Sequence, residues 1–334
     1  MKIKIGVALF LVLGAFLWGC TALRKAPPLM PIEEYQKLLV GRIDANYVGT
    51  TACLAACHVH DQKRDDFNAS TMGAQLSAES GLPLVDCESC HGPGSLAIEG
   101  ITAERVADDA AAGIMTACNY ETLLDLKTMP PAAKTMICTN CHTANATFNL
   151  HNWNAGTHAM QDVSCSDCHN IHAGPDLKVR PVDTAEMCFG CHKAQQAQFM
   201  LPNRHPVMEH KIFCTDCHDP HGTLSDYQLR GETAKEVCTR CHAEKAGPFA
   251  FEHAQNTEEC TRCHNPHGTV NENMLIAGQP FLCMQCHPGH RVDNSMLPDT
   301  GTDPRQRYIR CTYCHSQIHG SDIPGRGGAG RFTR

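Results

Sequence analysis

Cysteine and histidine recur along this chain in one fixed arrangement. Nine segments read Cys-x-x-Cys-His, and a tenth keeps the histidine but has three residues between its cysteines. Two thiols at this spacing can add across the two vinyl groups of one porphyrin, and the adjacent histidine then lies under the iron. The cysteines are Cys53 and Cys57, Cys87 and Cys90, Cys138 and Cys141, Cys165 and Cys168, Cys188 and Cys191, Cys214 and Cys217, Cys238 and Cys241, Cys260 and Cys263, Cys283 and Cys286, and Cys311 and Cys314. The histidines of motifs one to ten, in chain order, are His58, His91, His142, His169, His192, His218, His242, His264, His287 and His315.

Other chemistries use the same cysteine spacing. A single Cys-x-x-Cys can be a redox dithiol or half of a zinc site, and a cysteine-rich secreted chain can be a disulfide scaffold. Ten copies that all carry the histidine favour heme c, because the alternatives do not require it. The pattern therefore predicts ten covalently bound hemes. Cys118 lies outside the motifs, and we interpret it as a buried or incidental thiol.

Eleven histidines remain once the ten motif histidines are taken from the total of 21. Ten irons need ten second axial ligands, so the near match predicts bis-histidine coordination, which leaves no open position for a substrate. Three motifs have both a histidine that follows them as Cys-His-x-x-His and another that precedes them by seven to nine residues. These six are His172, His221 and His267, and His158, His205 and His253. Because each is so near its own motif, we expect it to ligate a neighbouring heme.

The motifs also repeat at a regular interval. From Cys138 onward their starts lie 22 to 28 residues apart, and a two-motif unit recurs every 45 to 50 residues. Such self-similarity indicates a linear array, and the Pro and Gly residues after many motifs favour turns over long helices. The predicted fold class is a multiheme cytochrome c, an elongated heme-packed array of short α-helices and coil with almost no β-structure. Helical stretches are expected at Thr184–Ala197 and Gly231–Lys245.

The remaining segments predict how the chain is organised. Residues 1–20 resemble an export signal with a lipobox that ends at Cys20, the alternative being a plain signal peptide or an uncleaved anchor. Residues 21–48 are predicted to be a tether, 49–320 the decaheme domain and 321–334 a tail rich in Gly and Arg. Within the domain, 100–137 is Ala-rich and is interpreted as an insertion that contains a helix.

Charge limits the class of partner. The formal net charge is -7, and the body shows no cluster of Lys and Arg. A phosphate-binding surface needs such a cluster, so nucleic acid is excluded as the expected partner.

Several stretches of the chain are similar to the MtrA/DmsE/PioA family of decaheme cytochromes. The resemblance spans roughly residues 45 to 322 and is strongest in Glu88-Ser89-Cys90-His91-Gly92-Pro93, from Cys238 to His253, in Asn265-Pro266-His267-Gly268, and from Cys314 to Ser321. In that family the hemes run through a β-barrel porin in the outer membrane. The resemblance implies three partners here: the porin, an extracellular multiheme cytochrome, and a periplasmic or inner-membrane cytochrome donor.

The family's second ligands match eight positions of this chain. They are His158, His172, His205, His221, His253, His267, His290 and His319. Two further histidines expected near residues 72 and 97 are missing, and Met72 occupies about the first of these places. Candidates for the open positions are His60, His151, His210 and Met72, and a surface role is an equal alternative for these histidines. The Cys53–Cys57 spacing and the lipobox also depart from the family pattern.

These features predict an electron carrier rather than an enzyme, in the periplasm or outer membrane and anchored through lipidated Cys20. The leading hypothesis is a conduit across the outer membrane for extracellular electron transfer. A lipid-tethered periplasmic shuttle is the alternative within the same class. A multiheme reductase would need an open iron position, and a polymerising filament would be hindered by a lipid anchor.

Overall fold

The computed structural model describes most of the chain after residue 42. The described residues are 43–56, 61–70, 72–81, 83–114, 116–142, 150–172, 180–253, 259–287, 310–313 and 315–323. The chain divides into two compact units. The first comprises residues 1–62 and 76–129, and the second comprises residues 63–75 and 130–334.

The first unit is organised around the buried carboxylate of Glu88, the residue after the first cysteine of motif two. Its helices are α3 (Thr50–Ala56), α5 (Glu88–His91), α6 (Ala103–Ala111) and the 3-10 turn η2 (Tyr120–Thr122). Glu88 Oε1 accepts from the amides of Val48 at 3.0 Å and Gly94 at 2.7 Å, and Oε2 accepts from Gly49 at 2.6 Å. Charge-assisted bonds of this kind are strong. They hold the chain before motif one against the loop after motif two.

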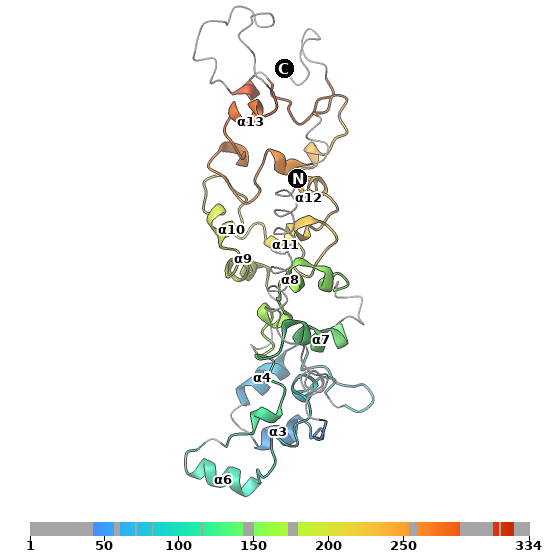
Figure 1. Cartoon of the computed structure of the whole chain (residues 1–334), viewed down its shortest axis with the longest axis vertical. Coiled ribbons are helices and arrows are strands. Elements are labelled where there is room, and N and C mark those ends of the chain that lie inside the picture. The colour runs from blue at the N-terminus through green and yellow to red at the C-terminus, as the bar shows by residue number, and fades with distance from the viewer. Residues whose placement is uncertain are drawn as a thin grey trace, which may run out of the picture. The chain divides into compact units, whose positions relative to one another are not determined.

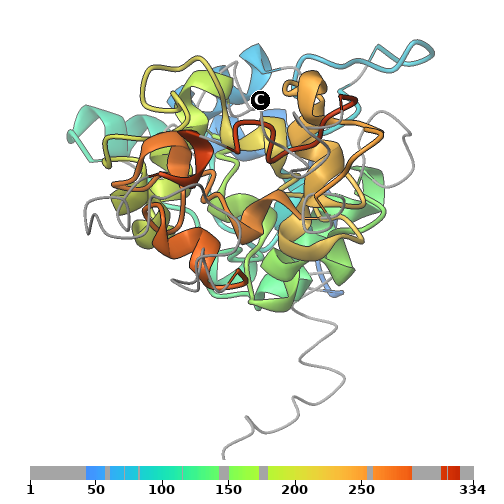
Figure 2. The same cartoon turned by 90° about the horizontal axis from the view of Figure 1, so that it is seen from above.

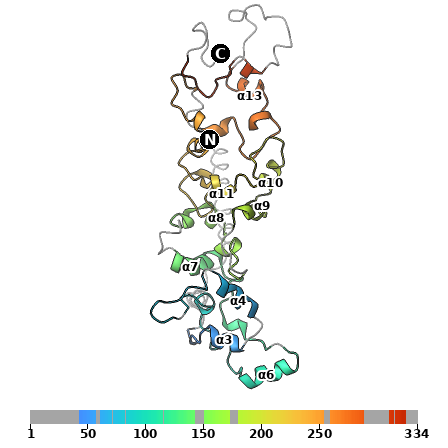
Figure 3. The same ribbon diagram turned by 180° about the vertical axis from the view of Figure 1, so that it is seen from behind.

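The second unit consists of short helical turns joined by coil. Its α-helices are α4 (Asp61–Ala69, which starts in the first unit), α7 (Pro131–His142), α8 (Thr157–Met160), α9 (Thr184–Phe189), α10 (Lys193–Gln198), α11 (Cys214–Cys217), α12 (Ala234–Thr239) and α13 (Phe281–Met284). Its 3-10 turns are η3 (Trp153–Ala155), η4 (Cys165–Asp167), η5 (Pro181–Asp183), η6 (Asp226–Gln228), η7 (Ala243–Lys245), η9 (Cys260–Arg262), η10 (Glu272–Met274) and η12 (Cys311–Tyr313). From α7 to α13 the helices of this unit follow one another broadly in chain order (Figure 1), as the view from behind also shows (Figure 3).

Local hydrogen bonds explain why the motifs form turns. In eight described motifs the histidine amide donates to the carbonyl of the first cysteine at 2.8 to 3.1 Å, which closes one helical turn. Where the motif contains aspartate before its second cysteine, that carboxylate caps the turn. Asp167 accepts from the amide of Ser164 at 2.7 Å, and Asp216 accepts from the amide of Phe213 at 2.8 Å.

The helices predicted at Thr184–Ala197 and Gly231–Lys245 are present but shorter than predicted. The first divides into α9 and α10, and the second into α12 and η7. Each break falls at the end of a motif, because His192 and His242 have ψ near +60°, outside the helical region. The helix expected within residues 100–137 is confirmed by α6, which Thr102 caps by accepting from the amide of Arg105.

Side chains alone build only a small apolar core. The buried cluster in the second unit is Ala185, Phe189, Phe199 and Val207, with Met208 and Ile212 against it. The prediction of almost no β-structure is confirmed, since the described residues form only isolated bridges, and the view from above shows no sheet (Figure 2). Within the described ranges no helix has the length and apolar character needed to span a membrane.

Three glycines that follow a predicted second ligand lie at close crossings of the chain. Gly222, Gly268 and Gly320 have φ of +102°, +143° and +134°. A Cβ on Gly222 would lie 2.5 Å from the carbonyl oxygen of Asn152, and one on Gly268 would overlap the carbonyl of Gln198. These crossings bring each preceding histidine against an earlier repeat, so only glycine fits.

Replacing Gly268 by alanine should therefore destabilise the protein by about 2 kcal/mol or more, through positive-φ strain and steric overlap. The urea midpoint of the heme-loaded protein measures the change. The control is Gly278→Ala, because Gly278 has no positive φ and the nearest atom to its new Cβ is the side-chain oxygen Oδ1 of Asn271, at 3.3 Å. Equal midpoints for the two variants would contradict the role given to Gly268.

Candidate heme-binding sites

Six motif histidines lie opposite six of the histidines predicted as second ligands. In each pair the two ring centres are 6.0 to 6.3 Å apart. The pairs, motif histidine first, are His169 with His221, His192 with His158, His218 with His267, His242 with His205, His264 with His319, and His287 with His253. All six lie in the second unit.

This separation fits one metal ion between two imidazoles. A metal–nitrogen bond is about 2 Å long, so two such bonds and about half of each ring place the ring centres about 6 Å apart. Among the described residues, no group of three or more His, Cys, Asp and Glu side chains could hold a metal. A porphyrin supplies the four equatorial nitrogens itself, so pairs of histidines are the donor set that heme requires.

The pairs follow one rule in each direction along the chain. The histidine of motif four, six or eight lies opposite the histidine that comes just after the second motif further along the chain. For example, His169 of motif four lies opposite His221, which follows motif six. The histidine of motif five, seven or nine lies opposite the histidine that comes just before the preceding motif. For example, His192 of motif five lies opposite His158, which precedes motif four. In none of the six does a second histidine serve the motif nearest to it. Each site is therefore shared between repeats.

Backbone carbonyls orient several of these rings. The Nδ1 atoms of the motif histidines His218 and His264 bond to the carbonyls of Tyr227 and Asn273 at 2.8 and 2.7 Å. For second histidines, Nδ1 of His158 bonds to the carbonyl of Pro220 at 3.1 Å. A carbonyl can only accept, so Nδ1 carries the hydrogen and Nε2 is free to bind metal.

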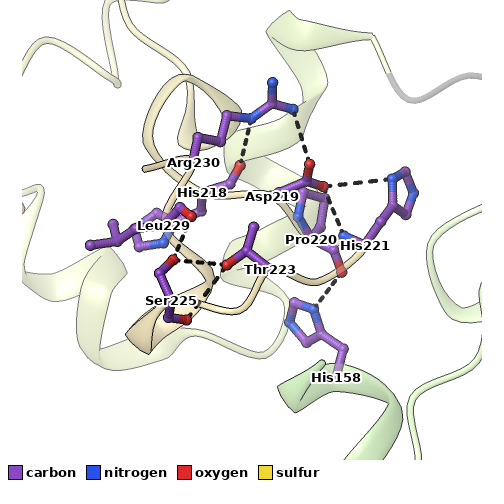
Figure 4. Close-up of polar contacts among 9 residues, drawn as sticks. All are labelled: His158, His218, Asp219, Pro220, His221, Thr223, Ser225, Leu229 and Arg230. Atoms are coloured by element: carbon purple, nitrogen blue, oxygen red, sulfur yellow. Dashed lines mark hydrogen bonds and ion pairs between the residues drawn. The ribbon is translucent and has the colours of Figure 1, made fainter. Parts of the chain in front are cut away.

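Figure 4 shows how one Cys-His-x-x-His loop is held. Asp219 is buried and accepts from the amide of His221 at 3.1 Å, while Arg230 lies 3.9 Å from the same carboxylate. The Nδ1 atom of His158 reaches the carbonyl of Pro220 from an earlier repeat. The turn that presents His221 is thus tied to the segment that presents His158.

Burial keeps the second histidines in the form that binds metal. Burial lowers the pKa of His221, against the opposing effect of the Asp219 carboxylate. It is also the main reason that the pKa values of His253, His267 and His319 are lowered. A lowered pKa favours neutral imidazole, which is the ligand form.

The motif cysteines of successive repeats also approach one another. The first cysteines of motifs five and six are within hydrogen-bonding reach, and this contact lowers the pKa of Cys214 to about 7. The same contact joins Cys138 to Cys165 and Cys238 to Cys260. The second cysteines approach at the alternate junctions. Burial raises the pKa of Cys168, Cys217 and Cys263, with smaller contributions from Cys191, Cys241 and Cys286 respectively.

Comparisons with known proteins identify the family of the heme-binding motifs. Residues 158–197, 205–247 and 253–292 match the family described as "Doubled CXXCH motif", and residues 111–170 match "Cytochrome c554 and c-prime". The chain is 35% identical over 288 residues to "Multiheme cytochrome MtrA" of Shewanella baltica (strain OS185), which covers 83% of this chain and 79% of that protein. This chain belongs to the MtrA family of multiheme cytochromes. Like other members of the MtrA family, it is a heme c electron carrier and not an enzyme.

A solved structure gives a weaker match. The undecaheme cytochrome from the S-layer of Carboxydothermus ferrireducens aligns at 18% identity with a TM-score of 0.15, over 72% of this chain and 40% of that one. This score is too low to indicate a shared overall structure. The multiheme cytochrome fold class follows from the motif matches together with the short helices and near absence of β-structure in the described residues.

Several predicted site residues lie beyond these six pairs. Cys57, His58, His60, His290 and Cys314 lie outside the described residues. His151 and His210 are exposed, Met72 is half-buried, and the amide of His172 donates to Oδ1 of Asn170 at 3.2 Å. The ligand roles of these residues stay predictions.

The interpretation of Cys118 as an incidental thiol is wrong, because Cys118 is disulfide-bonded. The described cysteines of the heme motifs form no disulfide.

Sequence reasoning also missed the polar residues that hold the rings. Asn170, Asp219 and Asn265 each accept from the amide of the histidine two residues later, at 3.1 to 3.2 Å. The recurrence of Asn or Asp directly after the motif histidine was a usable signal, since these side chains stabilise such turns. The carbonyl partners of Nδ1 carried no signal, because every residue has a carbonyl.

Replacing His267 by alanine should leave the iron held by His218 with an open position. The reduced variant should then bind about one equivalent of carbon monoxide, whereas the parent protein binds little. The shift of the Soret band on adding carbon monoxide measures the stoichiometry. Lys193→Ala is the control, because Lys193 is exposed and is not a candidate ligand. A parent-like response in the His267→Ala protein would contradict this assignment.

Proposed function

We propose that this chain carries electrons across the outer membrane through ten hemes arranged in motif order, inside a β-barrel porin. Each heme is attached at the two cysteines of its motif, with the motif histidine as one axial ligand. In six sites the second ligand is the paired histidine of another repeat. The count of ten rests on the ten sequence motifs.

The order of the motifs carries this proposal. The first cysteines of motifs three and four, five and six, and seven and eight touch in pairs, and the second cysteines approach at the junctions between these pairs. Motif ten joins the series because Cys311 contributes to the raised pKa of Cys283. Hemes attached to neighbouring thiols must be neighbours. The second unit therefore supports an uninterrupted series from motif three to motif ten.

The paired histidines favour electron transfer over catalysis. The iron of a bis-histidine heme changes between its ferric and ferrous states without opening a coordination position. The polypeptide keeps both imidazoles in place by burial and by bonds to backbone carbonyls, as at His218 and His264. Little structural change is then needed when an electron arrives or leaves.

Membership of the MtrA family supports the placement in a porin, with the extracellular cytochrome and the periplasmic or inner-membrane donor as further partners. The apolar leader that ends at Cys20 supports export and attachment to a membrane by lipid. The proposed location is the periplasmic side of the outer membrane, with the heme domain entering the barrel.

The test is to solubilise outer membranes in mild detergent and purify the protein at native abundance. We expect a β-barrel protein at equal stoichiometry, identified by mass spectrometry. Mixing with membranes from a strain that lacks this protein before purification controls for association after lysis. Recovery of the cytochrome alone would contradict the conduit and establish the periplasmic shuttle.

Removing one attachment site should disturb more than one heme. Cys238 contacts Cys260, and His242 of the same motif is paired with His205 from an earlier repeat. Replacing Cys238 and Cys241 together by alanine should therefore lower the yield of heme-loaded protein several-fold. The control is Arg240→Ala, which changes the same motif but keeps both thiols. A stable nine-heme protein with normal hydrogen-exchange protection would contradict this expectation.

A further inference from the structure

Trp153 is the one tryptophan of the chain outside the leader, where Trp18 lies. It begins η3, and only 7% of its surface is exposed. Its indole Nε1 is buried and has no hydrogen-bond partner among the described residues. A buried N–H without an acceptor destabilises the folded state, and such groups are rare in folded proteins. Trp153 therefore requires an acceptor that the described polypeptide does not supply.

The fold fixes the position of this indole. Gly156, just after η3, is so close to the loop after motif six that a Cβ on it would lie 3.1 Å from Cα of Gly222. A Cβ on Gly222 would in turn lie 2.5 Å from the carbonyl oxygen of Asn152. These two backbone approaches hold Trp153 beside His221. The centres of the two rings are 6.4 Å apart, and their planes make an angle of 59°.

His221 belongs to the pair that His169 completes, with ring centres 6.2 Å apart. Groups that lie against His221 are therefore next to the heme of motif four. Heme c carries two carboxylates, and a carboxylate is the strongest type of acceptor for a neutral N–H. We propose that the indole N–H of Trp153 donates a hydrogen bond to a carboxylate of the heme bound between His169 and His221.

The next repeat provides an internal comparison. Phe199 occupies the corresponding place, with its ring 5.4 Å from His267 at an angle of 56°. It is buried to a similar extent, and the residue before it, Gln198, lies against Gly268 as Asn152 lies against Gly222. The aromatic ring at this place thus packs against the second histidine in both repeats. Trp153 differs from Phe199 in having an N–H donor, and Trp153 is the one tryptophan of the chain outside the leader.

This hydrogen bond has a defined effect on the heme. The negative charge of a free carboxylate near the iron favours the ferric state. Donation from Trp153 withdraws part of that charge and so favours the ferrous state, which raises the reduction potential. The heme of motif four should accept electrons more readily than it would with phenylalanine at position 153. Trp153 is in this sense a positioning residue for a carboxylate and not an axial ligand.

The first measurement uses the intact heme-loaded protein. Ultraviolet resonance Raman spectroscopy reports the hydrogen-bonding state of the indole, and Trp153 is the tryptophan observed once the leader is removed. The expected spectrum is that of an indole with a strong acceptor and slow exchange of its N–H in deuterium oxide. A spectrum typical of an indole without an acceptor would overturn the proposal.

The second measurement compares reduction potentials of the parent protein and Trp153→Phe by spectroelectrochemical titration. One component should shift to lower potential, and the others should stay in place. Phenylalanine is accepted at position 199, so the variant should keep its full heme content. If the smaller ring disturbs packing, benzothienylalanine at position 153 preserves the shape and removes only the N–H. No shift in either protein would overturn the proposal.

The same titration on a His221→Met background assigns the shifted component, because a methionine ligand moves that heme to higher potential. Trp153→Phe should then shift the displaced component and leave the remaining envelope unchanged. A shift elsewhere would overturn the assignment to this heme. The inference rests on the proposed pairing of His169 and His221. If His221→Met moves no component to higher potential, the pairing itself is contradicted. If one component moves but Trp153→Phe does not change its potential, only the present inference is contradicted.

Discussion

The opposed pair of imidazoles from two different repeats is the interaction on which the rest of the second unit depends. The members of a pair are separated by 34 residues for His158 and His192 and by 55 for His264 and His319. Closing loops of this length costs conformational entropy, and short helices with a small apolar core contribute little against that cost. Bonds from both histidines to one iron would supply the missing free energy, as metal binding does in other small or weakly packed domains.

The polypeptide around each pair positions its two histidines through turns, close backbone crossings and hydrogen bonds. Turns closed by the motif histidine amide present two thiols and one imidazole from the same short segment. Glycine crossings such as Gly222 and Gly268 then bring a second histidine in from a distant segment. Carbonyl acceptors leave Nε2 as the binding atom, as for His205 with the carbonyl of Pro266 at 2.7 Å. Positions that look like loops in the sequence are therefore fixed by hydrogen bonds at several points.

The sequence carries information about heme attachment but little about which repeats come into contact. Cysteine spacing determines which residues can attach a heme, so the motifs and their histidines could be read directly. The second histidines could be recognised by their repeated positions, and the expectation that they serve other motifs agrees with the six observed pairs. Which motif each one meets could not be read, because that depends on crossings at Gly222, Gly268 and Gly320. The disulfide of Cys118 and the burial of Trp153 likewise arise from tertiary packing.

The pairing rule also explains why ligands at the ends of the chain are hard to assign. Motifs four, six and eight take a histidine that follows the motif two places later, and motifs five, seven and nine take one that precedes the motif before them. Among the ten motifs of the printed sequence, the tenth has no motif two places later and the first has no motif before it. Neither can obtain its second ligand by the rule that serves the interior. A regular repeat can therefore specify the ligand pairs in the middle of such an array, while the first and last motifs need second ligands that come from outside the repeat pattern.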